Sequence, residues 1–220
     1  MKISNIKNHL LQSLSPFALR HGFKVVKSHF CLKHEDETNE CQFSFDYNSW
    51  GDEIHLFPYV QIKNKTIHHV CEVNGFHLNY TAFINLLLLN KIQHGEYSDD
   101  TKWKMQYDRQ DRFVILEEND LEIAERKMSE LLPIGLDYLE QNSNIYAIDK
   151  MYNTPPLGKL NPNCSGLDTQ CMIGLIAAKY SKNTNYDEIC KYYSDLIHSE
   201  DILPETVSKF ELIKKYLGKL

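Results

Sequence analysis

The sequence predicts an α+β fold, with an N-terminal helix and an antiparallel sheet followed by a mostly helical C-terminal region. Three observations predict it. Apolar residues recur at three- and four-residue steps over residues 2–21, which is typical of one face of an amphipathic helix. Apolar and polar residues then alternate along 41–47 and 54–62, as they do in half-buried strands. Beyond residue 119 the apolar spacing is helical again.

The first 75 residues are expected to form one helix and a four-stranded antiparallel meander. A β-like pattern covers residues 23–32, directly after the glycine that ends the first helix. Turn-forming residues at 49–52 separate the two alternating segments, which predicts a hairpin. Alternation over 67–73 predicts the fourth strand.

The following region is expected to complete the same domain, which we place at residues 1–118. Residues 80–92 are apolar enough for a helix, and a polar loop follows them. Two further segments, 103–107 and 112–116, are expected to be strands that extend the sheet.

An acidic helix is expected at residues 119–152, packed on the sheet. Asn119 and Glu122 have the capping-box spacing of a helix N-terminus. Pro133 lies within the apolar stripe of this helix. A kink is expected there, because proline removes an amide donor and clashes with the preceding turn.

Prolines and glycines at 153–167 predict a linker, and three short helices are expected at 168–220 as part of the same globule. Asn185 is the expected N-cap of the second of these helices. Pro204 and Gly218 stand where a third helix would begin and end, since proline favours the first turn and glycine follows the last.

The composition is that of a globular protein. Of the 220 residues, 42% are hydrophobic and 25% are charged, which excludes a disordered tail, a collagen-like repeat and a disulfide miniprotein. A chain of this length can bury a core without a metal or a disulfide, so no cofactor is expected.

The six cysteines include no Cys-x-x-Cys pair, and we expect buried thiols. The start of the chain lacks the apolar run of a secretory signal, and no apolar stretch approaches the roughly 20 residues that cross a bilayer, so we expect a cytoplasmic protein without membrane contact.

The net charge of −6 arises entirely in the second half of the chain. Residues 1–110 carry 12 basic and 12 acidic side chains, whereas residues 111–220 carry 12 basic and 18 acidic ones. Between Glu117 and Asp149, nine acidic residues accompany two basic ones. Such a segment repels a phosphate backbone, so direct nucleic-acid binding is not expected, whereas a basic protein would be attracted.

No motif for nucleotide binding or hydrolysis is present. The sequence lacks the glycine-rich dinucleotide fingerprint and the phosphate-binding loop. It also lacks the His-Glu-x-x-His zinc motif and the Gly-x-Ser-x-Gly nucleophile elbow. We therefore expect a non-enzymatic protein.

Histidines suggest one alternative chemistry. Nine of the ten precede residue 95, and His69 and Cys71 would share a face of the expected fourth strand. With His55 from a neighbouring strand they would supply nitrogen and sulfur ligands for a metal-dependent hydrolase. Polar strand histidines beside buried thiols are the competing interpretation, because the spacing matches no standard metal site. A small-ligand-binding domain between sheet and helices also stays open.

Aromatic and acidic side chains are the candidate partner-binding residues. Trp50 lies at the expected hairpin tip, and Tyr47 and Trp103 lie on expected strands. Exposed aromatic residues often anchor protein interfaces. A protein partner is therefore expected, and the exposed edges of an antiparallel sheet would also allow a homodimer. The acidic candidates stand around the start of the acidic helix: Glu117, Glu118, Glu122 and Glu125.

The order of these features resembles that of a loose group of uncharacterised bacterial cytoplasmic proteins of the immunity type, encoded in polymorphic toxin loci. The resemblance implies a protein that binds and neutralises a toxin, such as a basic nuclease, and it supplies no catalytic residue. It covers the first 75 residues and part of the C-terminal helices. It is carried by the leading helix, the entry Gly22-Phe23-Lys24 into the sheet, the strand at 43–47 and the late helices that include 177–180 and 186–196.

Overall fold

The protein is described from a computed structural model. Residues 2–98, 100–154, 160–199 and 202–220 are described. The linker expected at 153–167 includes residues 155–159, which lie outside the described residues.

The chain divides into two compact units, and each unit draws on separated stretches of the sequence. Unit 1 comprises Met1–Asp36, Glu40–Gln61 and Phe83–Glu140. Unit 2 comprises Glu37–Asn39, Ile62–Ala82 and Gln141–Leu220.

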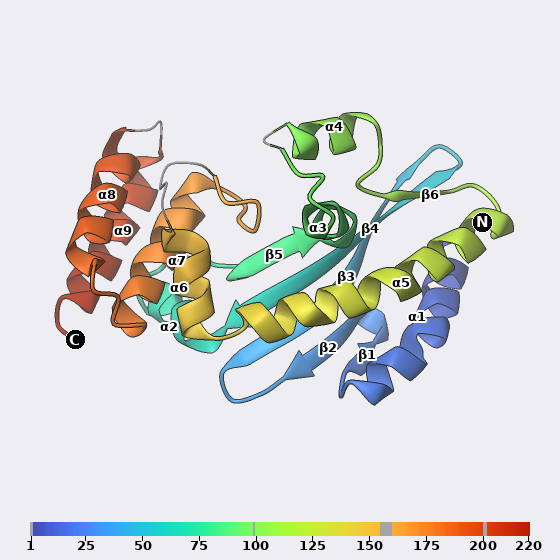
Figure 1. The fold of residues 1–220 in the computed structure, drawn as a ribbon, viewed down its shortest axis with the longest axis horizontal. Coiled ribbons are helices and arrows are strands. Elements are labelled where there is room, and N and C mark those ends of the chain that lie inside the picture. Colours follow the sequence, from blue (N-terminus) through green and yellow to red (C-terminus); the bar gives the residue numbers. More distant parts are fainter. Residues whose placement is uncertain (1, 99, 155–159, 200–201) are drawn as a thin grey trace. The chain divides into compact units, whose positions relative to one another are not determined.

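Unit 1 has the α+β architecture that the sequence predicts (Figure 1). Its sheet has the strand order β1-β2-β3-β4-β5, and β6 pairs antiparallel with β4. The elements that lie wholly or mostly in this unit are α1 (Ile3–Arg20), β1 (Lys24–Val26), the 3-10 turn η1 (Lys27–His29), β2 (Cys31–Glu35), β3 (Asn39–Trp50), β4 (Glu53–Asn64), β5 (Ala82–Asn85), α3 (Leu86–Gln93), α4 (Thr101–Tyr107), β6 (Phe113–Ile115) and α5 (Glu118–Asn142).

The first helix and the central hairpin are confirmed. The predicted stripe of α1 is buried at Ile6, Leu10, Leu11, Leu14 and Ala18. β3 and β4 are neighbours in the sheet, and the turn between them contains Gly51 with a φ of +62°, a left-handed conformation that glycine adopts without strain.

Helices α1 and α5 pack on one face of this sheet (Figure 1). The ring of Phe43 on β3 meets Phe17 of α1 edge to face, with 6.0 Å between the ring centroids. Gly135 of α5 lies so close to Phe43 and Leu86 that a Cβ there would overlap both side chains. At the alternate positions of β4, Phe57 contacts Arg112 and Tyr59 contacts Phe83 of β5.

Three elements differ from the sequence prediction. Residues 67–73 lie in helix α2 (Lys65–Val73) instead of a fourth meander strand. The alternation was misleading because Ile67, Val70 and Cys71, which are buried, also satisfy the helical spacing. The segment 103–107 lies in α4 instead of a strand, and the helix expected at 80–92 is split into strand β5 and helix α3.

The acidic segment forms two helices instead of one. Asn119 lies inside α5 and is not its N-cap, because the helix begins at Glu118. The carboxylate of Asp120 instead accepts hydrogen bonds from the backbone amides of Leu116, at 3.0 Å, and Glu117, at 3.1 Å. α5 continues as one helix across Pro133 and ends at residue 142, and α6 begins at residue 145.

Unit 2 is helical, and the three late helices are confirmed. Its core surrounds α7, in which all ten residues from Thr169 to Ala178 are buried. Pro204 begins α9 and Gly218 follows its last residue, as expected. The helices of this unit are α2 (Lys65–Val73), α6 (Ile145–Asn153), α7 (Leu167–Tyr180), α8 (Tyr186–Ser199) and α9 (Pro204–Leu217).

The six cysteines are free thiols, as predicted. Five are buried and Cys190 is half-buried. Across the described ranges, none of the helices is both long and apolar enough to span a membrane.

Candidate functional site

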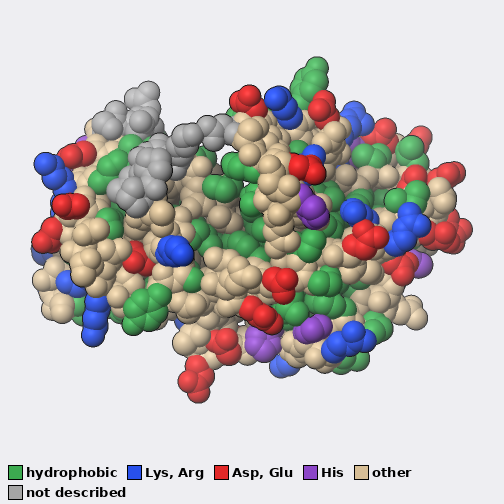
Figure 2. Space-filling model, in the orientation of Figure 1, with side chains coloured by type: hydrophobic (Ala, Val, Ile, Leu, Met, Phe, Trp, Pro, Cys, Tyr) green, Lys and Arg blue, Asp and Glu red, His purple; other side chains and the backbone are tan. Residues whose placement is uncertain are grey.

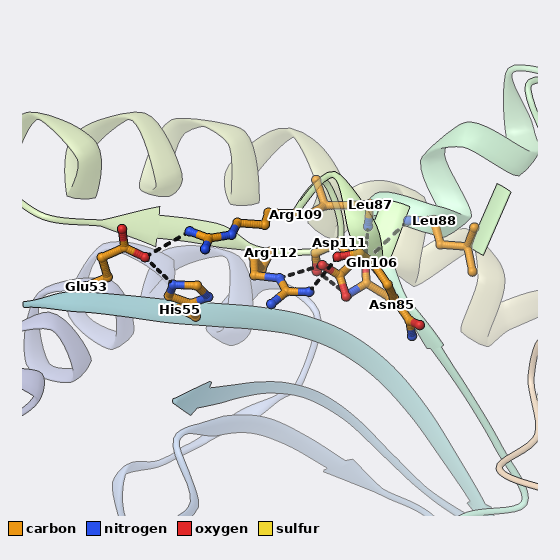
Figure 3. Close-up of polar contacts among 9 residues, drawn as sticks. All are labelled: Glu53, His55, Asn85, Leu87, Leu88, Gln106, Arg109, Asp111 and Arg112. Atoms are coloured by element: carbon orange, nitrogen blue, oxygen red, sulfur yellow. Dashed lines mark hydrogen bonds and ion pairs between the residues drawn. The ribbon is translucent and has the colours of Figure 1, made fainter. Parts of the chain in front are cut away.

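A polar cluster lies at the hairpin end of the sheet in unit 1 (Figure 3). The carboxylate of Glu53, at the start of β4, contacts two basic groups. His55 Nε2 lies 2.8 Å from Glu53 Oε2, and Arg109 Nη1 donates to the same oxygen at 3.1 Å. Hydrogen bonding to His55, together with the nearby charge of Arg109, lowers the pKa of Glu53.

His55 is fully buried in this cluster. The ring of Trp50 lies over the imidazole, with 4.5 Å between the centroids. Its Nδ1 has no hydrogen-bond partner in the described part of the chain. A histidine oriented by a carboxylate could act as a general base, but this imidazole is closed off from solvent. It therefore supports Trp50 instead of offering a catalytic nitrogen.

Arg112 forms a second ion pair, with its neighbour Asp111, and its guanidinium lies against aromatic rings of β3 and β4. Arg112 Nε donates to Asp111 Oδ1 at 2.6 Å, and Nη2 donates to the backbone oxygen of Gln106 at 3.2 Å. The guanidinium lies 4.9 Å from the ring centroid of Phe57 and 5.9 Å from that of Trp50. Such cation–π contacts hold the aromatic rings in place.

Asn85 links the loop before β6 to α3. Its Nδ2 donates to the backbone oxygen of Asp111 at 2.8 Å, while its Oδ1 accepts from the first amides of α3 at Leu87 and Leu88 (Figure 3). A single asparagine thus caps a helix and ties down the loop.

The predicted aromatic residues are all exposed, but they occupy different elements. Trp50 is 53% exposed at the end of β3, and Tyr47 is 40% exposed on the same strand, where Lys7 Nζ lies 4.2 Å from its ring centroid. Trp103 lies on α4 instead of a strand, where it is 76% exposed. Tyr107 lies one helical turn beyond it and is 90% exposed.

The acidic candidates differ in their exposure and in their contacts. Glu117, Glu118 and Glu122 are exposed around the start of α5, where Figure 2 shows acidic side chains gathered. Glu125 is engaged instead, since its Oε2 lies 2.6 Å from Nε2 of His9. Two apolar side chains, Leu116 and Ile123, are exposed among the acids.

The structure removes the geometric basis of the metal site. His69 and Cys71 lie on α2, where residues two apart point to nearly opposite sides; His69 is exposed and Cys71 is buried. Burial raises the pKa of the Cys71 thiol to about 12, so it is protonated near neutral pH. His55 belongs to unit 1, whereas α2 belongs to unit 2. In the described ranges, no three His, Cys, Asp or Glu side chains form a group that could hold a metal ion.

The sequence analysis selected Trp50 and His55 but did not identify the charged residues of the polar cluster around them. The residues it missed are Glu53, Arg109, Asp111 and Arg112. A usable signal was the spacing of Glu53 and His55, which puts both on one face of a strand.

Comparisons with known proteins found no match: no family model, no curated protein and no solved structure matches the chain.

Proposed function

We propose that the protein is a non-enzymatic binding module of the bacterial cytoplasm that neutralises a basic protein toxin, such as a nuclease. The binding surface would lie at the hairpin end of unit 1. We call it the hairpin-end surface, and it consists of Trp50, Leu116, Glu117, Glu118, Glu122 and Ile123.

The observation that carries this proposal is the combination of exposed apolar anchors with unpaired acidic side chains. Trp50 and Leu116 are each 53% exposed. The pairing of Ile54 with Ile115 brings the residue after β6, Leu116, level with the hairpin turn that follows Trp50. Tryptophan is among the residues that most often carry the binding energy of protein interfaces, so Trp50 is the expected anchor, with Leu116 packing beside the partner.

The surrounding acids suggest the chemistry of the partner. Glu117, Glu118 and Glu122 form no ion pair with any residue in the described ranges. Their field would speed the approach of a basic protein and would be weakened by salt. A nuclease has such a basic surface, because its active site must attract phosphate.

Two further observations support the proposal. The ring of Trp50 contacts both His55 and Arg112, so it would lose little conformational freedom on binding. The free, buried thiols are typical of a reducing compartment, which supports a cytoplasmic location. A homodimer formed through a sheet edge is the alternative, and the capture experiment described next would also detect it.

The test compares two pairs of charge-neutralising substitutions on the same helix. Glu118→Gln with Glu122→Gln removes two carboxylates from the hairpin-end surface. Asp137→Asn with Glu140→Gln removes two exposed carboxylates from the other end of α5 and is the matched control. Each tagged protein is used at low and high salt to capture partners from the host lysate, and association rates are measured with the partner so identified.

The first pair should slow association several-fold at low salt, and Trp50→Ala should speed dissociation, while the control pair behaves as the parent protein. The proposal fails if both pairs and Trp50→Ala bind the partner equally well. It also fails if the only species retained is a second copy of this chain.

A further inference from the structure

A pocket in unit 2 combines basic, apolar and unpaired polar groups. It has a volume of about 340 Å³, close to the lower limit for small-molecule sites. Lys63 from the end of β4 and His68 and Glu72 from α2 line it together with the loop that follows α2. That loop contributes Gly75, Phe76, His77 and Leu78.

The basic side of the pocket has unsatisfied charge. Lys63 forms no ion pair in the described ranges, and this includes Glu72 on the same pocket. His68 Nε2 is buried and has no hydrogen-bond partner among the residues described. Burial and the neighbouring Lys63 and His77 together lower the pKa of His68 to about 4. The imidazole is therefore neutral near pH 7 and retains one N–H donor.

The remaining wall limits the kind of anion that fits. Phe76 and Leu78 are nearly buried and present apolar surface. Glu72 contributes a negative charge, which opposes a dianion such as phosphate more strongly than a monoanion. One free ammonium group, one neutral donor and an apolar wall match a carboxylate attached to a small apolar body.

We propose that this pocket binds a small organic carboxylate, with its carboxylate near Lys63 and His68 and its apolar part against Phe76 and Leu78. The site is independent of the hairpin-end surface. The carboxylate would pair with the charge of Lys63 and accept a hydrogen bond from the N–H of the neutral His68 ring.

Benzoate is the probe. Histidine ring signals are followed by NMR and assigned with His68→Gln and His77→Gln. We expect benzoate to shift both signals saturably, and benzyl alcohol, which has the same ring without the charge, to leave them unchanged. Inorganic phosphate, an anion without an apolar body, should bind more weakly than benzoate. If benzyl alcohol shifts the histidine signals as much as benzoate does, the pocket does not recognise an anion and the proposal is overturned. If phosphate binds as tightly as benzoate, the apolar part of the ligand contributes nothing and the proposal of an organic ligand is overturned.

Charge variants test the location. Lys63→Gln should weaken benzoate binding about fivefold, since a partly exposed ion pair contributes up to roughly 1 kcal/mol. Lys215→Gln, which removes an exposed lysine of α9, is the matched control and should leave the affinity unchanged. Glu72→Gln should tighten binding, so the proposal can be tested even if Lys63→Gln folds poorly. Equal affinity in Lys63→Gln, Glu72→Gln and the control would overturn the assignment.

Discussion

Tyr193 of α8 occupies the space that a side chain at Gly174 of α7 would need. A Cβ at position 174 would lie 2.6 Å from the ring carbons Cε2 and Cζ. The tyrosine hydroxyl lies in turn 3.0 Å from the backbone oxygen of Tyr152 and 2.9 Å from Oδ1 of Asn153. The close approach of α7 and α8 therefore depends on a glycine and positions a buried hydroxyl.

Gly174→Ala should destabilise the protein by about 1–3 kcal/mol, because a well-packed core resists one extra methyl group. Urea unfolding followed by circular dichroism measures this change. Asp195→Ala, on the exposed surface of α8, should stay within about 0.5 kcal/mol. A Gly174→Ala protein as stable as this control would contradict the packing described for α7 and α8.

Asp149 is the centre of a buried hydrogen-bond network in the same unit. Its Oδ1 accepts from Asn153 at 2.6 Å, and its Oδ2 accepts from Ser181 at 2.9 Å and from Asn183 at 2.8 Å. Asp149→Asn places an amide NH2 against these donors, so we expect a loss of roughly 2 kcal/mol. The midpoint of urea unfolding checks this, and an unchanged midpoint would show that the donors find other partners.

Arg109 combines backbone strain with an ion pair. Its φ is +58°, in the left-handed region that non-glycine residues avoid. Arg109→Ala keeps the strain and loses the contact with Glu53, whereas Arg109→Gly loses both. The glycine variant should therefore be more stable than the alanine variant by about 1 kcal/mol. The opposite order in thermal unfolding would refute the left-handed conformation.

His68 should make stability depend on pH. Its pKa is about 4 in the folded protein against 6.5 ordinarily, because burial and the charges of Lys63 and His77 disfavour the imidazolium. Below pH 6.5 the imidazole is protonated in the unfolded chain but stays neutral in the folded one. His68 therefore does not lower the free energy of unfolding above pH 6.5, but lowers it increasingly as the pH falls toward 4, by at most about 3 kcal/mol.

His68→Gln removes this titration, so its unfolding free energy should fall less steeply than that of the parent protein between pH 6.5 and pH 4. His198→Gln, at an exposed histidine of α8, provides the control. Parallel curves for the parent protein and His68→Gln would contradict the shifted pKa.

The sequence pattern was informative where burial followed one clear periodicity. The stripe of α1, the alternation of β3 and β4, and the Pro and Gly limits of α9 were all predictable because a single element satisfied each pattern. Residues 67–73 satisfied two periodicities at once. The capping contact from Asn64 Oδ1 to the amide of Ile67, at 3.2 Å, marks the helix start, but an asparagine followed by lysine fits a turn equally well.

The candidate site was only partly predictable for a different reason. The place of Trp50 at a hairpin tip followed from local sequence, but its exposure did not, because an aromatic residue beside a turn can be buried or exposed. The contact of Arg109 with Glu53 and those of Arg112 with Trp50 and Phe57 join residues more than 50 positions apart, and no local pattern encodes such pairings. Trp103 was assigned to the wrong element because alternating aromatic residues fit both a strand and the exposed side of a short helix.

The interleaving of the two units has a consequence for synthesis. Ile67, Val70 and Cys71 of α2 share a core cluster with residues of α7, α8 and α9, which are made more than 90 positions later in the chain. At translation rates of about 5–20 residues per second, Ile67, Val70 and Cys71 would wait on the order of ten seconds before α7 leaves the ribosome. During that interval the nascent chain presents an apolar helix face without its cover, which makes it a natural substrate for chaperones that act on ribosome-bound chains.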